Sequence, residues 1–224
     1  GRLILGGDHL GPLTWRDEAE ESAMEKAQEL VRMYVSAGFS KIHLDTSMRL
    51  ADDPKTERLP DDVIARRAAR LCSAAESAAK GEKPVYVIGS EVPVPGGATE
   101  NEDSVAVTKP EDLKSTLDAF HKAFIDNGLE QAWKRVIAAV VQPGVEFGDG
   151  SVHAYDRRKA ASLTAALAPH APLVFEGHST DYQEAVRLRG MVEDGVAILK
   201  VGPALTFAYR EALFALESIE RELP

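Results

Sequence analysis

Short apolar runs alternate with longer segments whose apolar residues recur at helical spacing along the 224-residue chain. A short apolar run bounded by turn residues is typical of a buried strand. Six runs of this kind predict strands, at Leu3–Leu5, Lys41–Leu44, Val85–Ile88, Arg135–Val141, Leu173–Phe175 and Ala197–Leu199.

An amphipathic segment follows each run. In the first, Thr14 is expected to act as a helix cap and Gly38 ends the helical spacing. Pro60 and Pro110 suit the first turns of the second and third helices, since proline is tolerated there. The remaining helices are predicted at Asp156–Ala168, Asp181–Val192 and Ala204–Leu223.

The strand–helix alternation predicts an α/β fold with a parallel sheet and helices packed outside it. Six units are present, whereas a closed (β/α)8 TIM barrel has eight strands. We therefore predict one barrel domain over residues 1–224, with the first one or two N-terminal strand–helix units absent from this chain. A doubly wound open sheet is the alternative; it requires no missing strands, but the sequence has no GxGxxG turn that opens a helix.

Composition excludes several classes of function. The chain has 26 Lys and Arg against 36 Asp and Glu, a formal net charge of -10, which disfavours nucleic acid as a ligand. Cys72 is the single cysteine and excludes a disulfide framework. No apolar stretch is long enough to span a bilayer and no secretory signal is visible, so we expect a cytoplasmic protein.

Polar residues concentrate immediately after the predicted strands. In a (β/α) barrel these positions face a common mouth, where active sites are built. The groups are Gly6-Gly7-Asp8-His9, His43-Leu44-Asp45, Gly89-Ser90-Glu91, Gln142-Pro143-Gly144-Val145-Glu146, Glu176 to Asp181, and Lys200 to Pro203. Charges that serve only solubility belong on helix faces, so this placement indicates a working rim.

Individual residues of the rim have competing interpretations. Asp8 could cap a loop and His9 could be a packing residue, and for this pair function and structure are equally favoured. His43 lies inside its strand and is interpreted as a core or interlayer histidine, although strand alternation points Asp45 the same way. Glu91 is interpreted as functional, because a carboxylate beside a barrel mouth is costly unless it is paired or bound to a metal.

Imidazoles beside carboxylates suit a divalent metal such as zinc or manganese. Such an ion would polarise a sugar carbonyl or hydroxyl while a nearby carboxylate moves protons. The candidate metal ligands are His9, Glu146, Glu176 and His178, and the candidate catalytic residues are Asp8, Asp45 and Glu91.

A phosphate site is expected at the last two strands. The segment after the final strand leads directly into a helix N-terminus, which offers free backbone N–H groups and the positive end of the helix dipole. In (β/α)8 barrels the loops after strands seven and eight often bind phosphate. The candidate phosphate-binding residues are Gly177, Ser179, Thr180, Lys200, Gly202 and Thr206.

Six motifs resemble the GatZ/KbaZ family of D-tagatose-1,6-bisphosphate aldolase subunits. They are Gly6 to Pro12, Gly38 to Asp45, Glu91 to Gly97, Val141 to Phe147, His178 to Tyr182 and Leu199 to Phe207. The family is similar to class II, metal-dependent aldolases, so the resemblance implies a class II aldolase-like barrel. Residue by residue, Asp8 matches the proton-transfer aspartate of that class, His9 its first metal histidine, and Glu91 a glutamate of its fifth strand. Glu146 and Glu176 stand where the other two metal histidines would be.

The resemblance implies an accessory subunit that supports the activity and stability of a separate catalytic aldolase subunit of the GatY/KbaY type. The ligand would be a phosphorylated ketohexose. The resemblance leaves open whether the chain forms a homo-oligomer. The alternative is a free-standing metal-dependent sugar-phosphate aldolase or a ketohexose 4-epimerase. Some relatives are labelled tagatose 6-phosphate kinases, but the chain has no GxxxxGK[ST] loop.

Overall fold

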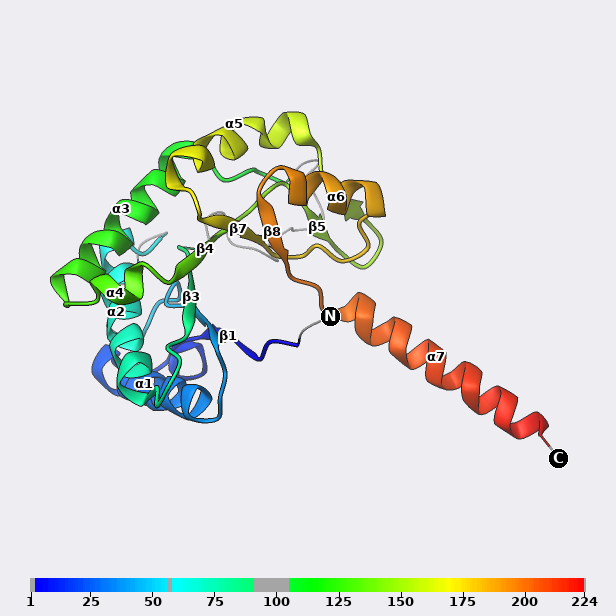
Figure 1. Cartoon of the computed structure of the whole chain (residues 1–224), viewed down its shortest axis with the longest axis horizontal. Coiled ribbons are helices and arrows are strands. Elements are labelled where there is room, and N and C mark those ends of the chain that lie inside the picture. The colour runs from blue at the N-terminus through cyan, green and yellow to red at the C-terminus, as the bar shows by residue number, and fades with distance from the viewer. Residues whose placement is uncertain (1–2, 56–57, 91–104, 224) are drawn as a thin grey trace.

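A curved, six-stranded parallel sheet forms the centre of the computed structural model, which describes residues 3–55, 58–90 and 105–223 (Figure 1). Its strand order is β1-β2-β3-β4-β7-β8. The strands are β1 Gly6–Leu10, β2 Lys41–Leu44, β3 Val85–Ile88, β4 Val136–Val141, β7 Val174–Gly177 and β8 Val196–Leu199. The order follows the sequence without reversal, as in a barrel, whereas a doubly wound sheet contains a reversal point. The predicted parallel α/β architecture is thus confirmed as a half-barrel.

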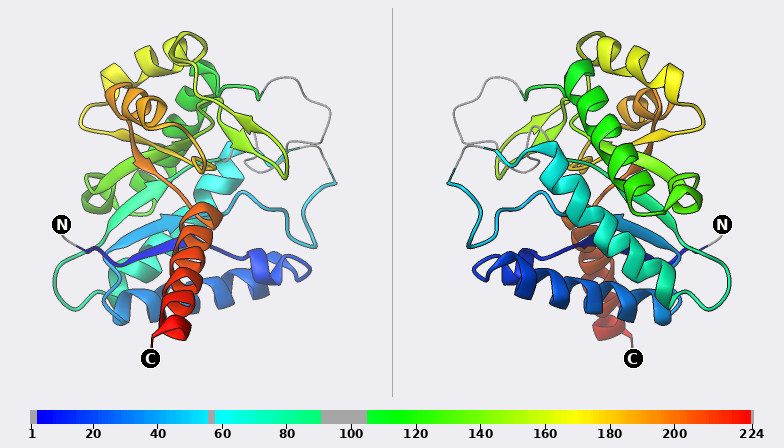
Figure 2. Two further views of the ribbon diagram at one scale, coloured as in Figure 1. Left: turned by 90° about the vertical axis from the view of Figure 1, so that its right-hand side faces the viewer. Right: turned by 90° about the vertical axis from the view of Figure 1, so that its left-hand side faces the viewer.

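Helices cover one side of this sheet, and Figure 2 shows them outside the strands. Neighbours along the chain pack side by side, α1 on α2 and α2 on α3. The helices are α1 Glu20–Ser36, α2 Asp61–Ala78, α3 Pro110–Asp126, α4 Glu130–Trp133, α5 Arg157–Leu167, α6 Ala185–Glu193 and α7 Pro203–Glu222, with 3-10 turns at Leu13–Trp15 and Ala168–His170. None of the helices in the described ranges combines the length and apolarity needed to cross a membrane.

The two faces of the sheet differ in chemistry because side chains alternate along a strand. The helix-covered face carries large apolar side chains such as Ile42, Tyr86 and Phe175, which belong to the main core. The opposite, inner face has a small apolar cluster around Val87 and Val140. Its polar side chains gather at the carboxyl ends of the strands and form the site described below.

Several local predictions are wrong. β1 begins at Gly6, after the predicted strand, and Leu3 is 87% exposed; the strand continues through two glycines that an apolar pattern does not include. Thr14 lies in a 3-10 turn and caps no helix. Instead, the backbone N–H of Glu20 at the start of α1 donates to the Asp52 carboxylate at 2.9 Å.

The strands β5 and β6 and the helix α4 have no counterpart in the sequence pattern. Strands β5 Glu146–Phe147 and β6 Val152–His153 form an antiparallel hairpin after β4. Strands of two residues are too short to produce an alternating pattern. The four-residue helix α4, Glu130–Trp133, likewise spans only about one turn, which is too short for helical periodicity.

The last helix, α7, projects away from the half-barrel, and its C-terminal end is far from the sheet (Figure 1). No side chain of this helix is buried. Its large apolar residues are all more than 45% exposed, namely Leu205, Phe207, Tyr209, Leu213, Phe214, Leu216 and Ile219.

A buried guanidinium anchors α1, α2 and the loop after β2 to one another. Arg67 of α2 is fully buried and donates to both carboxylate oxygens of Asp53, at 2.9 and 2.7 Å. It also donates to Glu20 at 2.7 Å, and Glu20 accepts further hydrogen bonds from Arg66. Asp53, in the loop after β2, therefore supports the packing of two helices.

Candidate functional site

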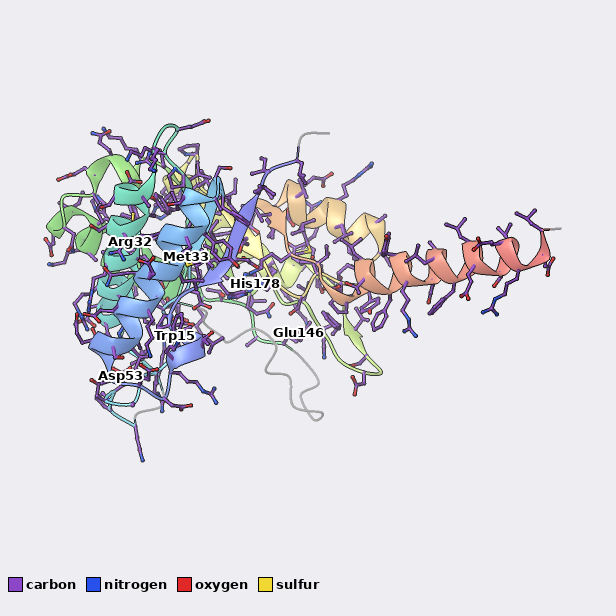
Figure 3. The ribbon with its side chains drawn as sticks, turned by 90° about the horizontal axis from the view of Figure 1, so that it is seen from below. Trp15, Arg32, Met33, Asp53, Glu146 and His178 are labelled. Carbon is purple, nitrogen blue, oxygen red and sulfur yellow. The ribbon has the colours of Figure 1, made fainter. Side chains whose placement is uncertain are left out.

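The carboxyl ends of β1, β2, β7 and β8 bring a polar cluster together on the inner face of the sheet. In Figure 3, His178 lies beside the end of β1, although the two are far apart in sequence. The rings of His9 and His178 have centroids 5.0 Å apart, and those of His9 and His43 are 4.8 Å apart. Three imidazoles from three parts of the chain thus share one site, which we call the strand-end cluster.

His9 is oriented by Asp45. Its Nδ1 lies 2.8 Å from Asp45 Oδ2, and Ser47 donates to Asp45 Oδ1 from its backbone N and its hydroxyl at 3.2 and 2.8 Å. An ionised carboxylate only accepts hydrogen bonds, so His9 Nδ1 carries the proton and the lone pair of Nε2 points into the cluster. Ligating histidines are commonly held by a carboxylate in this way. Asp45, a predicted catalytic residue, therefore acts here by positioning His9.

His43 belongs to the cluster, although its place inside a strand predicts a core or interlayer histidine. It is fully buried, but its Nδ1 lies 3.3 Å from Asp8 Oδ1 and 3.8 Å from Glu176 Oε1. The backbone N–H of His9 also donates to this nitrogen at 3.4 Å. Glu176, itself fully buried, contacts His178 Nε2 through the same Oε1 at 3.2 Å, so the predicted pair of Glu176 and His178 faces one site.

Two lysines complete the cluster. Lys200 Nζ lies 2.8 Å from Asp8 Oδ2 and within 2.9 Å of the Nε2 atoms of His9 and His178. Lys41 Nζ forms an ion pair with Glu176 Oε2 at 2.7 Å. Lys200 was predicted only as a phosphate ligand, and Lys41 had no predicted role. Because Lys200 follows β8 and Asp8 lies in β1, these contacts join the two edge strands of the half-barrel.

The carboxylates of the cluster are held in their ionised form. Burial raises the pKa of Asp8, but its contacts with His43 and Lys200 outweigh burial and hold the pKa well below its usual range. Burial also raises the pKa values of Asp45 and Glu176. Hydrogen bonds to His9 and His178, respectively, together with nearby positive charge, lower each of these pKa values to about 2. At neutral pH Asp8 therefore carries no proton that it could donate.

The cluster has the donors and the spacing of a metal site. In two overlapping groups, His9 with His43 and His178, and Asp8 with His43 and Glu176, one ligand atom per residue lies within 4.8 Å of every other. Imidazole nitrogens with carboxylate oxygens are ligands that zinc and manganese accept. The residues present therefore fit a divalent cation, with His43 as a donor that the sequence did not identify.

One predicted metal ligand lies apart from the cluster. Glu146, a predicted metal ligand, is buried in the β5–β6 hairpin, and Figure 3 places it apart from His178. Within the described residues neither metal-capable group includes it. Glu91, a predicted catalytic residue, lies outside the described residues.

The predicted phosphate residues surround the start of α7, where Asp181 is already bound. The Asp181 carboxylate accepts from the backbone N–H groups of Gly202 and Ala204 at 3.0 and 2.9 Å. The Thr180 hydroxyl donates to the carbonyl of Lys200 at 2.9 Å. An incoming phosphate would therefore have to displace Asp181 from these N–H groups, and the sequence motifs do not reveal this competitor.

The other phosphate candidates have structural features of their own. Gly177 ends β7 against Val196, with only 2.8 Å between the Val196 Cγ1 and the position of an added Cβ. Ser179 has a positive φ of 53°. The Thr206 hydroxyl lies 3.4 Å from the carbonyl of Gly202 within α7.

Comparison with known proteins identifies the family. A family model described as D-tagatose-1,6-bisphosphate aldolase subunit GatZ/KbaZ-like matches residues 1–224. The chain belongs to the GatZ/KbaZ-like family. The resemblance inferred from the six motifs is thereby confirmed.

Individual members of the family carry different names. The chain is 55% identical over 225 residues to the D-tagatose-1,6-bisphosphate aldolase subunit GatZ of Salmonella paratyphi B, and 54% identical over 224 residues to a D-tagatose 6-phosphate 4-epimerase of Agrobacterium fabrum. Each match covers 99% of this chain and 52% of the relative. A crystal structure of a probable tagatose 6 phosphate kinase from Sinorhizobium meliloti 1021 is similar at 50% identity with a TM-score of 0.83, covering 96% of this chain and 51% of that one. The chain spans about half the length of the curated relatives it matches.

Proposed function

We propose that the chain acts as part of an accessory subunit of D-tagatose-1,6-bisphosphate aldolase, raising the activity and stability of a separate catalytic subunit. The observation that carries the proposal is the match with subunit GatZ relatives, which includes 99% of the chain at 53–55% identity. The phosphorylated ketohexose would bind at the strand-end cluster.

A complete class II aldolase-like (β/α)8 barrel is the fold we propose around this half-barrel. Six parallel strands in sequential order with helices on the outer face support it. The contacts of Lys200 with Asp8 and His9 also support it, because they hold the first and last strands of the sheet toward one another.

Within this barrel, His9, His43 and His178 would hold a zinc or manganese ion, with Glu176 beside His43 and His178 and with Asp45 positioning His9. A bound ion of this kind polarises a carbonyl or hydroxyl oxygen of a sugar. Asp8 would take a proton from the sugar, since its carboxylate is ionised and its side chain is 45% exposed. Glu91, a candidate catalytic residue from the sequence, would also take part in proton transfer.

The phosphate group would lie between the segments that follow β7 and β8. The proposed contacts come from the Lys200 ammonium and from backbone and hydroxyl groups of Gly177, Ser179, Thr180, Gly202 and Thr206. Asp181 would move away from the start of α7 as the phosphate binds, because both groups require the same N–H donors.

The accessory role is tested with the purified chain and a catalytic GatY/KbaY-type subunit, by following cleavage of D-tagatose 1,6-bisphosphate. We expect the chain alone to give no cleavage, and its addition to raise the rate and the thermal half-life of the catalytic subunit. Cleavage by the chain alone at an ordinary enzymatic rate of about 1 s⁻¹ or more, or a catalytic subunit indifferent to the chain, would contradict the proposal.

A second candidate function is the C4 epimerisation of a phosphorylated ketohexose. The proposal of this second function rests on the name of one relative, a D-tagatose 6-phosphate 4-epimerase, and on a cluster of three imidazoles and two carboxylates that could hold the metal ion. The test incubates the chain and Mn²⁺ with D-tagatose 6-phosphate and measures D-fructose 6-phosphate by chromatography. Product formed by the wild-type chain but not by an Asp8→Asn variant would support the epimerase function. Absence of product with the wild-type chain would exclude this function.

A further inference from the structure

Lys200 occupies the centre of the strand-end cluster. Its Nζ lies 2.8 Å from His9 Nε2, 2.9 Å from His178 Nε2, 2.8 Å from Asp8 Oδ2 and 3.6 Å from Glu176 Oε1. All four residues belong to the two metal-capable groups. The ammonium group is therefore surrounded by the atoms that a divalent cation would bind.

We propose that Lys200 is a built-in competitor of the divalent cation, which must displace the Lys200 ammonium in order to bind His9, His178 and the carboxylates. The inference rests on the metal site of the proposed function. It adds that Lys200 keeps the ligands assembled without the ion and weakens the affinity of the site for it.

The balance of charge supports competition over joint occupancy. Among the described residues of the cluster, Asp8, Asp45 and Glu176 supply three negative charges, and Lys41 and Lys200 supply two positive ones. With Lys200 displaced, the net charge of minus two matches one divalent cation. With both cations inside, positive charge would exceed negative charge beside a fully buried glutamate, which is unfavourable away from water.

The geometry allows Lys200 to leave. Its side chain is 18% exposed, so a path to solvent exists, and a lysine side chain has several rotatable bonds. Its backbone is fixed independently of the ammonium, because the Lys200 N–H donates to the carbonyl of Gly177 at 3.0 Å and its own carbonyl accepts from Thr180. The ammonium can thus move while the strand end stays in place.

Isothermal titration calorimetry with ZnCl2 and with MnCl2, on the whole 224-residue chain, tests the inference without an activity assay. Lys200→Met removes the ammonium and keeps the apolar stem. We expect it to bind the ion at least about tenfold more tightly than the wild type, because the wild type must first break the contacts of the Lys200 ammonium with Asp8 and His9. The loss of such charge-assisted hydrogen bonds exceeds the corresponding value of about 1.4 kcal/mol. Lys200→Arg keeps the charge and is expected to give no gain in affinity.

Lys41→Met is the matched control. Lys41 carries the same charge and is also 18% exposed, and it contacts the same two carboxylates, at 2.7 Å from Glu176 and 3.9 Å from Asp8. We expect a clearly smaller gain than in Lys200→Met. An equal gain in both variants would assign the effect to net charge and overturn the specific role of Lys200. Adding His178→Ala to Lys200→Met should abolish the gain if binding occurs in this cluster.

The remaining outcomes separate the inference from the proposed function. Equal affinities of the wild type and Lys200→Met would overturn the competition and leave the metal site standing. No binding by the wild type, Lys200→Met or a second variant, Lys200→Gln, would overturn both. Circular dichroism and thermal unfolding of each variant identify a misfolded protein, and Lys200→Gln then replaces Lys200→Met in the comparison.

Discussion

Replacing Arg67 with methionine should destabilise the protein strongly, because it leaves a paired carboxylate without its cation. Arg67 is fully buried, and the Asp53 side chain that it binds through two hydrogen bonds is only 9% exposed. Methionine retains most of the apolar volume, so the loss is mainly electrostatic. Removing one partner of a buried ion pair costs about 3–5 kcal/mol. At about 2–4 °C per kcal/mol for a chain of this size, the melting temperature should fall by about 6–20 °C.

The neighbouring Arg66 provides the control for this prediction. Arg66 also binds Glu20 from α2, but its side chain is 50% exposed, so Arg66→Met should cost about 1 kcal/mol or less. Thermal unfolding followed by circular dichroism compares the two variants. Equal and small losses would refute the argument that burial makes the Arg67 pair important. Adding Asp53→Asn to Arg67→Met should recover part of the loss, since the uncompensated charge is then removed.

Three further predictions concern Glu20 beside the same two arginines, a close backbone approach at Gly11 and the buried thiol of Cys72. The pKa of Glu20 is lowered from 4.5 to about 2, mainly by its hydrogen bond to Arg66. The contribution of Glu20 to stability is therefore complete above pH 4.5 and is lost as the pH falls toward 2. In urea titrations the stability advantage of the wild type over Glu20→Gln should shrink over that range, and a constant difference would contradict the assignment. Gly11→Ala should destabilise the chain by about 1–3 kcal/mol, because a Cβ at this position would overlap the carbonyl oxygen of Asp45. Gly81→Ala is the control, since a Cβ there meets open space, and it should be neutral in the same urea titration. Burial raises the pKa of Cys72 to about 12, so the native protein should leave an aromatic disulfide reagent unreacted until urea exposes the thiol, and rapid reaction without urea would contradict this.

The parallel strand–helix order could be predicted because each unit has a strong local pattern. The runs at Lys41–Leu44 and Val85–Ile88 match β2 and β3 residue for residue, since both are short apolar strands with turn residues on each side. The strand predicted at Leu3–Leu5 lies before the observed β1, because Gly6 and Gly7 have no side chains that could contribute to a hydrophobic pattern. Close packing requires glycine at position 7, where a Cβ would approach Tyr34 within 2.9 Å, and such tertiary contacts are not visible in sequence.

The candidate site was predicted where its residues follow a predicted apolar run and missed where they lie within one. Asp8, His9 and His178 come together as expected from a common mouth. Lys41 and His43 lie inside β2, on the same side of the strand as Asp45. Their alternation with Ile42 and Leu44 is a signal that could have identified them, because the polar side of an otherwise apolar strand must face something that pairs with it.

Backbone strain coincides with the site, and no sequence pattern reveals it. His9 and Ser179 have positive φ values of 47° and 53°, a region that residues other than glycine rarely adopt. Such conformations cost about 1–3 kcal/mol each and persist where surrounding contacts over-determine them. At His9 these contacts are identifiable, since Asp45 binds Nδ1, Lys200 binds Nε2 and His43 accepts from the backbone N–H. The same hydrogen bonds therefore hold the strained backbone and aim the Nε2 lone pair into the cluster, so that the geometry of the site and the conformation of the chain depend on one another.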